Sequence, residues 1–225
     1  MLISLGELVR PGMVALDIGA YVGYFTLAMA ARTGPTGCVY GFEPNPDQAA
    51  WLRRSISASG LQHAFAVPCA LGSAPGNFVL SVPENSSKAC IRKEALNTPG
   101  NYEVEMTTLD NWFDSTPNVE TVDFIKLDVE GMELDVLRGA INIIEKFKPQ
   151  IICEIHIHPS LPHRPISVVR WMESRGYRVT ILPQQQASVK SKTLTDTIAA
   201  LEQKVQLEPR QNIIYVCHVH AVAGK

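Results

Sequence analysis

MVALDIGAYVGYFT, residues 13–26, holds the most informative pattern of this chain: an apolar strand, a glycine turn and the start of a helix. The strand runs into Asp17, and the turn contains Gly19 and Gly23. This order is typical of an open α/β sheet, in which ligands bind in the crevice at the carboxyl ends of the strands. We therefore expect the turn after Asp17 to line a binding site.

The composition predicts one ordinary α/β domain. The chain has 225 residues, of which 46% are hydrophobic and 19% are charged, enough to bury a large core. The formal net charge of −2 gives no electrostatic reason to expect a nucleic acid as partner. The sequence has no basic segment followed by an apolar run at its start, and no stretch close to the ~20 apolar residues of a membrane span. These features predict a cytoplasmic protein without a membrane partner.

The five cysteines have no CxxC spacing, and most lie in apolar, strand-like runs. We expect buried, reduced thiols, with disulfides as the alternative. The residues are Cys38, Cys69, Cys90, Cys153 and Cys217.

Apolar strands alternate with amphipathic helices along the chain, the pattern of a parallel sheet covered on both faces. Strands are expected at about 13–18, 38–43, 63–69, 122–129, 151–157, 177–182 and 212–219. Helices are expected at about 22–32, 46–59, 132–146, 165–175 and 195–205. Residues 76–82 and 102–108 predict a two-stranded excursion. A single domain, residues 1–225, thus carries two insertions, at about 83–101 and 184–210, and long loops of this kind are often functional.

The turn after Asp17 favours a positively charged cofactor over a dinucleotide. Gly19 permits a sharp turn and close approach of ligand atoms, and Gly23 is expected to let the helix pack closely on the sheet. A pyrophosphate calls for GxGxxG, whereas this turn carries a carboxylate two residues before its first glycine. That carboxylate suits a cofactor with an ammonium group and a sulfonium. A structural turn without a ligand is the alternative.

Glu43 ends the second expected strand, where an acid can accept hydrogen bonds from both ribose hydroxyls. Pro44, Asn45 and Pro46 predict a rigid turn that holds this carboxylate and begins the next helix. A solvated acid at a strand end is the alternative. Ala70 and Leu71, after the third strand, are small and apolar, and they suit either a wall for an adenine ring or the core.

Asp128 ends the apolar strand DFIKLD and falls in the same crevice as the Asp17 turn. An acid at the end of a buried strand needs a partner. Glu130 and Glu133 lie in the first turn of the next helix, where acids favour the helix dipole, so a structural role is expected for both.

Alternation along the fifth strand places Glu154, His156 and His158 on one face. Beside Asp128, these residues suit a general base for a hydroxyl nucleophile. A divalent ion or a structural hydrogen-bond network are the alternatives, although no short spacing specifies a metal site.

Several motifs together resemble the FkbM family of S-adenosylmethionine-dependent methyltransferases, over about Val9 to His158. They are DIGAYVGYFTLAMA, YGFEPNP, ALG, TTLDNWF, DFIKLDVEGMELDVLRGA and PQIICEIH. The resemblance implies a class I methyltransferase (Rossmann-like) α/β fold. Its seven-stranded, mostly parallel sheet has the order 3-2-1-4-5-7-6, with the last strand antiparallel and helices on both faces. The resemblance also implies methyl transfer to a hydroxyl oxygen of a small molecule, typically a polyketide or a sugar.

The resemblance assigns roles to individual positions. It places the ribose contact at Glu43, the adenine side at Ala70 and Leu71, and the methionine end at Asp128. The cofactor-binding residues expected are Asp17, Gly19, Ala20, Tyr21, Gly23, Thr26, Glu43, Pro44, Asn45, Ala70, Leu71 and Asp128. The catalytic residues expected are Asp128, Glu154 and His156, with a base from Glu154 or His156 favoured. A divalent metal is left open, and no metal ligand is assigned.

Two features depart from the family pattern. Tyr21 stands where the family commonly has Asn, and only residues 1–12 precede the first strand, where the family usually carries more. Part of the substrate lid is therefore expected to be missing or to come from a partner chain, and a homo-oligomer is one such arrangement.

Two other classes of function stay open: a cofactor-binding module without turnover, and an NAD(P)-dependent oxidoreductase, which the absence of GxGxxG disfavours.

Overall fold

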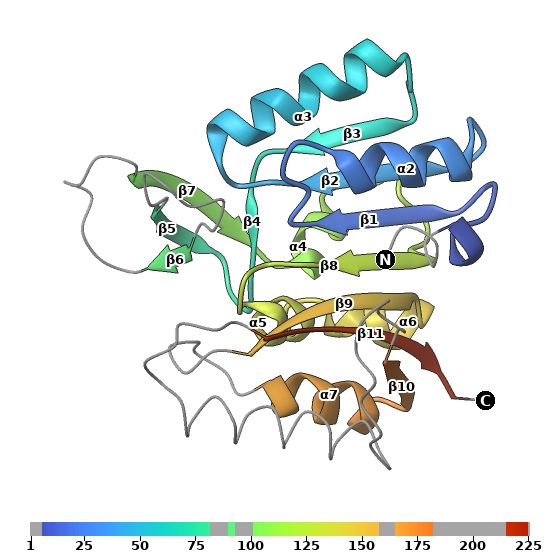
Figure 1. Ribbon diagram of the computed structural model, residues 1–225, viewed down its shortest axis with the longest axis vertical. Helices are drawn as coiled ribbons and strands as arrows, with labels where there is room; N and C mark the ends of the chain where they lie inside the picture. Colours follow the sequence, from blue (N-terminus) through green and yellow to red (C-terminus); the bar gives the residue numbers. More distant parts are fainter. Residues whose placement is uncertain (1–5, 82–89, 93–100, 158–164, 182–214, 225) are drawn as a thin grey trace.

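A seven-stranded sheet forms the centre of the protein, in the spatial order β3-β2-β1-β8-β9-β11-β10 (Figure 1). The computed structural model describes residues 6–81, 90–92, 101–157, 165–181 and 215–224. The strands are β1 (Val14–Ile18), β2 (Cys38–Phe42), β3 (Ala64–Val67), β8 (Phe124–Leu127), β9 (Gln150–Ile157), β10 (Tyr177–Ile181) and β11 (Tyr215–Ala223). β11 is antiparallel to both β9 and β10, and the remaining pairs are parallel. Numbered within this sheet alone, the order is 3-2-1-4-5-7-6, so the expected fold class is confirmed.

The two central strands explain the most apolar runs of the sequence. β1 (VALDI) and β8 (FIKL) are neighbours covered on both faces, which calls for continuous apolar residues. Each run is interrupted by a single charged side chain, Asp17 in β1 and Lys126 in β8. These two residues pair in the strand register, so the two charges lie side by side on one face of the sheet.

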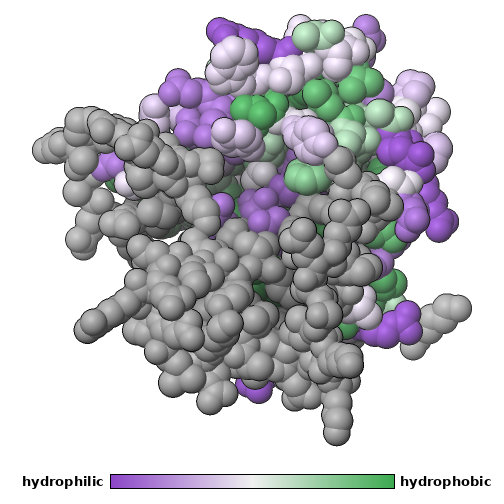
Figure 2. Space-filling model, in the orientation of Figure 1, coloured by the Kyte–Doolittle hydropathy of each residue, from purple (hydrophilic) through white to green (hydrophobic). Residues whose placement is uncertain are grey.

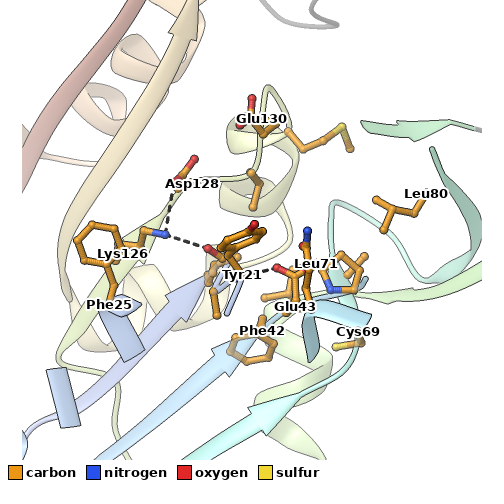
Figure 3. A pocket seen from close by; sticks show the side chains of 18 of the residues that line it. Tyr21, Phe25, Phe42, Glu43, Cys69, Leu71, Leu80, Lys126, Asp128 and Glu130 are labelled. Atoms are coloured by element: carbon orange, nitrogen blue, oxygen red, sulfur yellow. Dashed lines mark hydrogen bonds and ion pairs between the residues drawn. The ribbon is translucent and has the colours of Figure 1, made fainter. Parts of the chain in front are cut away.

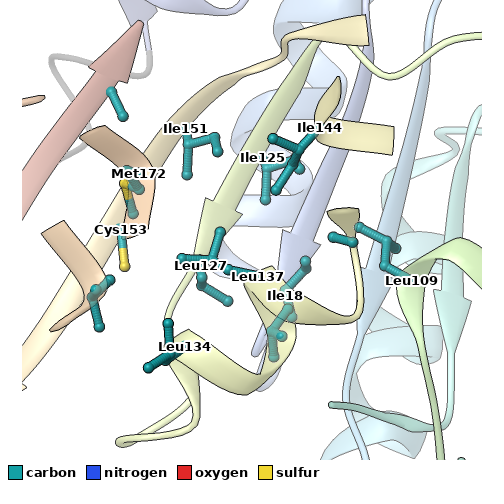
Figure 4. Packing of buried hydrophobic residues seen from close by; sticks show 14 of the residues in the cluster. Ile18, Leu109, Ile125, Leu127, Leu134, Leu137, Ile144, Ile151, Cys153 and Met172 are labelled. Atoms are coloured by element: carbon teal, nitrogen blue, oxygen red, sulfur yellow. The ribbon is translucent and has the colours of Figure 1, made fainter. Parts of the chain in front are cut away.

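Helices cover both faces of the sheet. α2 (Tyr24–Thr33) and α3 (Pro46–Ser59) cover one face, where Met29 and Ala30 pack against Ala15 and Phe124. Four helices contribute to the larger core on the other face, part of which is drawn in Figure 4. They are α4 (Leu109–Asp114), α5 (Glu133–Arg138), α6 (Ile141–Phe147) and α7 (Pro165–Ser174). Every buried side chain labelled in Figure 4 belongs to that core.

A second, four-stranded sheet lies beyond the carboxyl ends of β1, β2 and β8 (Figure 1). Its order is β4-β7-β5-β6, with β4 (Ala70–Leu71), β5 (Gly76–Ser81), β6 (Cys90–Arg92) and β7 (Asn101–Thr107). The expected excursion of two strands is present as β5 and β7, but β4 and β6 extend it. Ala70, Leu80, Val104 and Met106 form its own small core.

Other expectations need correction. The helix expected at 132–146 is two helices, α5 and α6, divided at Gly139 and Ala140. A Cβ at Gly139 would overlap the carbonyl oxygen of Gly72, so the chain passes the second sheet too closely for a side chain. α4 was not expected. It begins where the Thr108 side chain accepts a hydrogen bond from the Asn111 N–H.

The last strand continues to Ala223, four residues beyond the expected end at 219. Most of the expected 83–101 loop and the whole 184–210 insertion, with its expected helix at 195–205, lie outside the described residues.

Three cysteines fall where side chains are described, and all three are free thiols. They are Cys38 and Cys69, which are partly buried, and Cys153, which is buried as expected. The side chains of Cys90 and Cys217 lie outside the described part.

The surface over α2 and α3 mixes hydrophilic and hydrophobic residues (Figure 2). Its exposed large hydrophobic side chains include Tyr24 on α2 and Trp51 on α3. In the portion of the chain that the structure describes, no helix combines the length and apolar character needed to cross a bilayer.

Candidate cofactor site

A cavity of about 360 Å³ lies at the carboxyl ends of β1, β2 and β8, where the second sheet approaches them (Figure 3). This volume is in the range of pockets that hold cofactors and small ligands. Eight of the expected cofactor residues line it: Gly19, Ala20, Tyr21, Glu43, Pro44, Ala70, Leu71 and Asp128. The strand tips therefore converge as the sequence predicts.

Glu43 is fixed by the backbone on both of its oxygens. The Tyr21 N–H donates to Oε2 at 2.8 Å and the Asn45 N–H donates to Oε1 at 2.9 Å. The residue is 6% exposed and lines the cavity. Burial raises the pKa of the Glu43 carboxyl above its ordinary value, although both backbone hydrogen bonds act to lower it. Each oxygen keeps a second acceptor site, because a carboxylate oxygen has two lone pairs.

Asn45 and Pro46 hold Glu43 from the helix side. The Asn45 side chain caps α3 by accepting from the N–H groups of Asp47 and Gln48, and Pro46 occupies the first turn of that helix. This is a well-known way to begin a helix. Asn45 itself does not line the cavity, so its part is to orient Glu43 through its backbone N–H.

The backbone conformation at Tyr21 explains why Asn suits this position of the turn. Its φ is +53°, in the left-handed region that Asn tolerates far better than Tyr. The strained backbone directs the Tyr21 N–H onto Glu43. The side chain is 47% exposed and stands at the cavity, so Tyr replaces Asn here at a conformational cost.

Asp17 is buried behind the turn and does not line the cavity. Its side chain has no exposed surface; Oδ2 accepts from the Thr26 hydroxyl at 2.7 Å, and Oδ1 lies 3.2 Å from Lys126 Nζ. Thr26 is likewise fully buried. The structure thus does not bring Asp17 or Thr26 to the surface that a cofactor would touch.

Lys126 lines the cavity and was missed by the sequence reasoning. It is 1% exposed, and its Nζ lies 2.9 Å from Gly19 O and 3.5 Å from Asp128 Oδ2, besides its ion pair with Asp17. Burial by itself would lower the pKa of this lysine, but the two carboxylates outweigh burial and the pKa is raised. A lysine inside an otherwise apolar buried strand was the available signal.

Gly19 and Gly23 serve close packing of the chain on itself. A Cβ at Gly19 (φ +81°) would overlap the carbonyl oxygen of Asp128 and lie 2.9 Å from its carbon. A Cβ at Gly23 (φ +98°) would lie 2.6 Å from Leu52 Cδ1. The close approach expected at Gly23 is therefore to α3 and not to the sheet.

The loop after β8 divides its acids between two tasks. Asp128 lines the cavity, and its side chain keeps 24% of its surface exposed while it pairs with Lys126. Glu130 also lines the cavity, with a φ of +52°, and precedes α5, so its expected place in the first turn of that helix is wrong. Glu133 is buried and accepts from the Gly131 N–H at 2.9 Å, which is the structural role expected of it.

Glu154 lies next to this group on β9. Leu127 pairs with Cys153, so Glu154 is level with Asp128, one residue past the end of β8. Its charge contributes to the raised pKa of Lys126, but it is not among the residues that line the cavity. His156 follows in β9, and its side chain, like all of His158, lies outside the described part.

Within the described ranges, no group of three or more His, Cys, Asp or Glu residues is arranged to hold a metal ion. Among the described residues, the charged groups on the cavity wall are Glu43, Asp128, Glu130 and the almost fully buried Lys126. This excess of acids disfavours a pyrophosphate and favours a ligand with hydroxyl donors and positive charge.

Comparison with known proteins agrees with this arrangement. The model of the methyltransferase FkbM domain matches residues 17–179. "Methyltransferase 1" of Beauveria bassiana is 30% identical over 146 residues, which cover 55% of this chain and 57% of that protein. "Hexuronic acid methyltransferase AglP" of Haloferax volcanii is 28% identical over 147 residues, which cover 64% of this chain and 56% of that protein. The chain thus spans little more than half the length of these curated relatives.

Solved structures share the fold. A methyltransferase FkbM from Methylobacillus flagellatus superposes with a TM-score of 0.57 at 14% identity, over 98% of this chain and 50% of that one. Fibrillarin of Aeropyrum pernix, solved with bound S-adenosyl-L-methionine, gives a TM-score of 0.55 at 12% identity, over 98% and 74% of the two chains. At these identities the likeness establishes the architecture of the sheet and its helices.

Proposed function

The chain belongs to the FkbM methyltransferase family, and we propose that it is an S-adenosylmethionine-dependent O-methyltransferase acting on a hydroxyl of a small molecule. The observation that carries this proposal is the fixed carboxylate of Glu43 at the cavity wall. Two backbone N–H groups orient it, and its remaining lone pairs suit the two hydroxyls of a ribose.

The residues present fit S-adenosylmethionine better than a dinucleotide. Beside Glu43, Ala70 and Leu71 offer an apolar wall from β4, which suits a flat purine. At the other end of the cavity, Asp128 offers a partly exposed carboxylate, which suits the ammonium group of the methionine part. Among the described residues of this wall, a pyrophosphate would meet three acids and one lysine, Lys126, which is already paired with Asp17 and Asp128.

When bound, S-adenosylmethionine supplies an electrophilic methyl group together with its leaving group, so the protein has mainly to align and desolvate the reactants. Glu43 and the Gly19 turn would hold the nucleoside, and Asp128 would orient the amino acid part. The base that accepts the hydroxyl proton is assigned to the end of β9, at Glu154 or His156. Asp128 is less suited to that task because its carboxylate is already paired with Lys126.

The name of one relative supports the class of acceptor that we propose. The relative from Haloferax volcanii is named for a hexuronic acid, which makes sugars and sugar acids the first acceptors to test. The second sheet contributes Leu80 to the cavity wall, the turn contributes Tyr21, and the first residue of α2 contributes Tyr24. Apolar and aromatic side chains of this kind can pack on the faces of ring compounds.

Calorimetric titration with S-adenosylhomocysteine tests the cofactor, and a matched variant tests the site. We expect binding to the natural chain and at least tenfold weaker binding to Glu43→Gln, since a charge-assisted hydrogen bond contributes about 1.5–3 kcal/mol. Trp51→Ala, an exposed change on α3 away from the cavity wall, is the control and should bind like the natural chain.

No heat of binding at millimolar S-adenosylhomocysteine would overturn the proposal. With binding established, transfer of an isotopically labelled methyl group to a panel of sugars, sugar acids and polyketide alcohols tests the reaction. Product methylated at a nitrogen, or no product with any hydroxyl acceptor, would contradict O-methyl transfer.

A further inference from the structure

We propose that Lys126 is a positioning residue that ties the Gly19 turn and the Asp128 carboxylate into one unit at the methionine end of the site. The inference rests on the proposed function for the identity of the ligand. Its structural half, the link between the two strand tips, holds for the protein without any ligand.

The Lys126 ammonium group donates one hydrogen bond and forms two ion pairs inside the protein. An ammonium group has three N–H donors and no acceptor. Three oxygens surround Nζ: Gly19 O at 2.9 Å, Asp17 Oδ1 at 3.2 Å and Asp128 Oδ2 at 3.5 Å. The Phe25 ring, with its centroid 5.1 Å from Nζ, covers a further side. Lys126 therefore acts on a ligand through the groups that it holds.

These groups belong to two separate strand tips (Figure 3). Gly19 follows β1, whereas Asp128 follows β8, and the strands meet at this point through the hydrogen bond from Asp128 N–H to Ile18 O at 3.0 Å. The turn is also bound to β2, because the N–H groups of Gly19 and Ala20 both donate to Phe42 O. Lys126 thus adds a side-chain link at the junction of three strands.

The same contacts set the charge that a ligand meets. Asp17 and Asp128 together carry two negative charges, and Lys126 offsets one of them. Asp17 is fully buried and Asp128 is partly exposed, so of these two acids only Asp128 offers its carboxylate to the cavity. A carboxylate held in a fixed orientation by Lys126 suits the ammonium group of the ligand.

The test separates positioning from general stability. Lys126→Met alone would leave Asp17 buried without a counter-charge, so we pair it with Asp17→Asn, which keeps a partner for Thr26. Amide hydrogen exchange of Gly19 and Ala20 is measured in the ligand-free protein. We expect exchange at least tenfold faster in Lys126→Met/Asp17→Asn than in the natural chain. The control, Tyr177→Phe, removes the buried hydrogen bond to Pro149 O and should leave these two amides unchanged.

A double-mutant cycle then asks whether Lys126 acts through Asp128. Asp128→Asn is expected to weaken S-adenosylhomocysteine binding about tenfold in the natural background and less than threefold in Lys126→Met/Asp17→Asn. Equal factors in both backgrounds, or unchanged exchange at Gly19 and Ala20, would overturn the proposal. If the natural chain binds no S-adenosylhomocysteine, the proposed function fails while the exchange measurement still judges the link.

A measurement on the natural chain covers the case in which the variants do not fold. The three contacts predict that the Lys126 ammonium protons exchange slowly with water and give a distinct NMR signal. An ammonium group in rapid exchange, like that of an exposed lysine, would overturn the proposal.

Discussion

Replacing Gly19 with Ala should damage both the fold and the site. Gly19 has a φ of +81°, and an added Cβ would overlap the carbonyl oxygen of Asp128. The substitution therefore meets two costs. A left-handed backbone costs an L-residue about 1–2 kcal/mol, and forcing the β1 turn away from the β8 tip costs about 1–3 kcal/mol more.

Gly176 offers a matched control for the first cost. It has the same φ of +81°, but an added Cβ would meet nothing within 4 Å. The free energy of unfolding of Gly176→Ala should therefore fall only by the backbone cost. The difference in this free energy between the two variants isolates the contact with Asp128.

Urea unfolding gives both losses of free energy, and calorimetry gives the affinity for S-adenosylhomocysteine. We expect Gly19→Ala to lose at least 1 kcal/mol more than Gly176→Ala, a fall of about 0.5 M in the urea midpoint or more. Only Gly19→Ala should weaken binding. Equal losses and equal affinities would refute the close approach of the two strand tips on which the site depends.

The other predictions concern the same turn and its neighbours. Tyr21→Asn should raise the free energy of unfolding by about 0.5–1 kcal/mol in urea titrations, because Asn tolerates the left-handed backbone at this position; a loss of stability would contradict the strain. Burial raises the pKa of Glu43, so the stability that its protonation contributes is present below the ordinary glutamate pKa and is lost as the pH rises through the raised value. Affinity for S-adenosylhomocysteine, which needs the carboxylate, should rise over that same pH interval, and Glu43→Gln should remove this dependence in calorimetry. A Cβ at Gly23 would lie 2.6 Å from Leu52 Cδ1, so Gly23→Ala should lower the free energy of unfolding less in a Leu52→Ala background than in the natural chain. Equal losses in both backgrounds would show that the start of α2 does not contact α3 there.

The sequence predicts the central sheet well because the buried strands are short apolar runs, most of them with Gly or Pro close to their ends. The order of these strands came from the family resemblance, since apolar runs do not specify their neighbours. The division of α5 from α6 was missed because it arises from the contact of Gly139 with Gly72, and the two residues are far apart in sequence. The second sheet was only half predicted, since β4 and β6 have two and three residues, too few for a period to be seen.

The sequence predicts where the site lies, but it predicts less well which side chains contact one another there. Glu43 lies where the motif places it because the Pro44–Pro46 turn is local. Asp17 was expected to face the cofactor, but the counter-charge that turns it inward, Lys126, lies on another strand. Only the register of β1 with β8 pairs them. The lone lysine in the apolar run of β8 was the signal that a buried partner exists.

A structure of the chain with S-adenosylhomocysteine tests the central claim most directly. We expect both ribose hydroxyls within hydrogen-bond distance of Glu43, the amino group beside Asp128, and Asp17 still paired with Lys126 out of reach of the ligand. A nucleoside bound elsewhere, or Glu43 in contact with only Tyr21 and Asn45, would contradict the account.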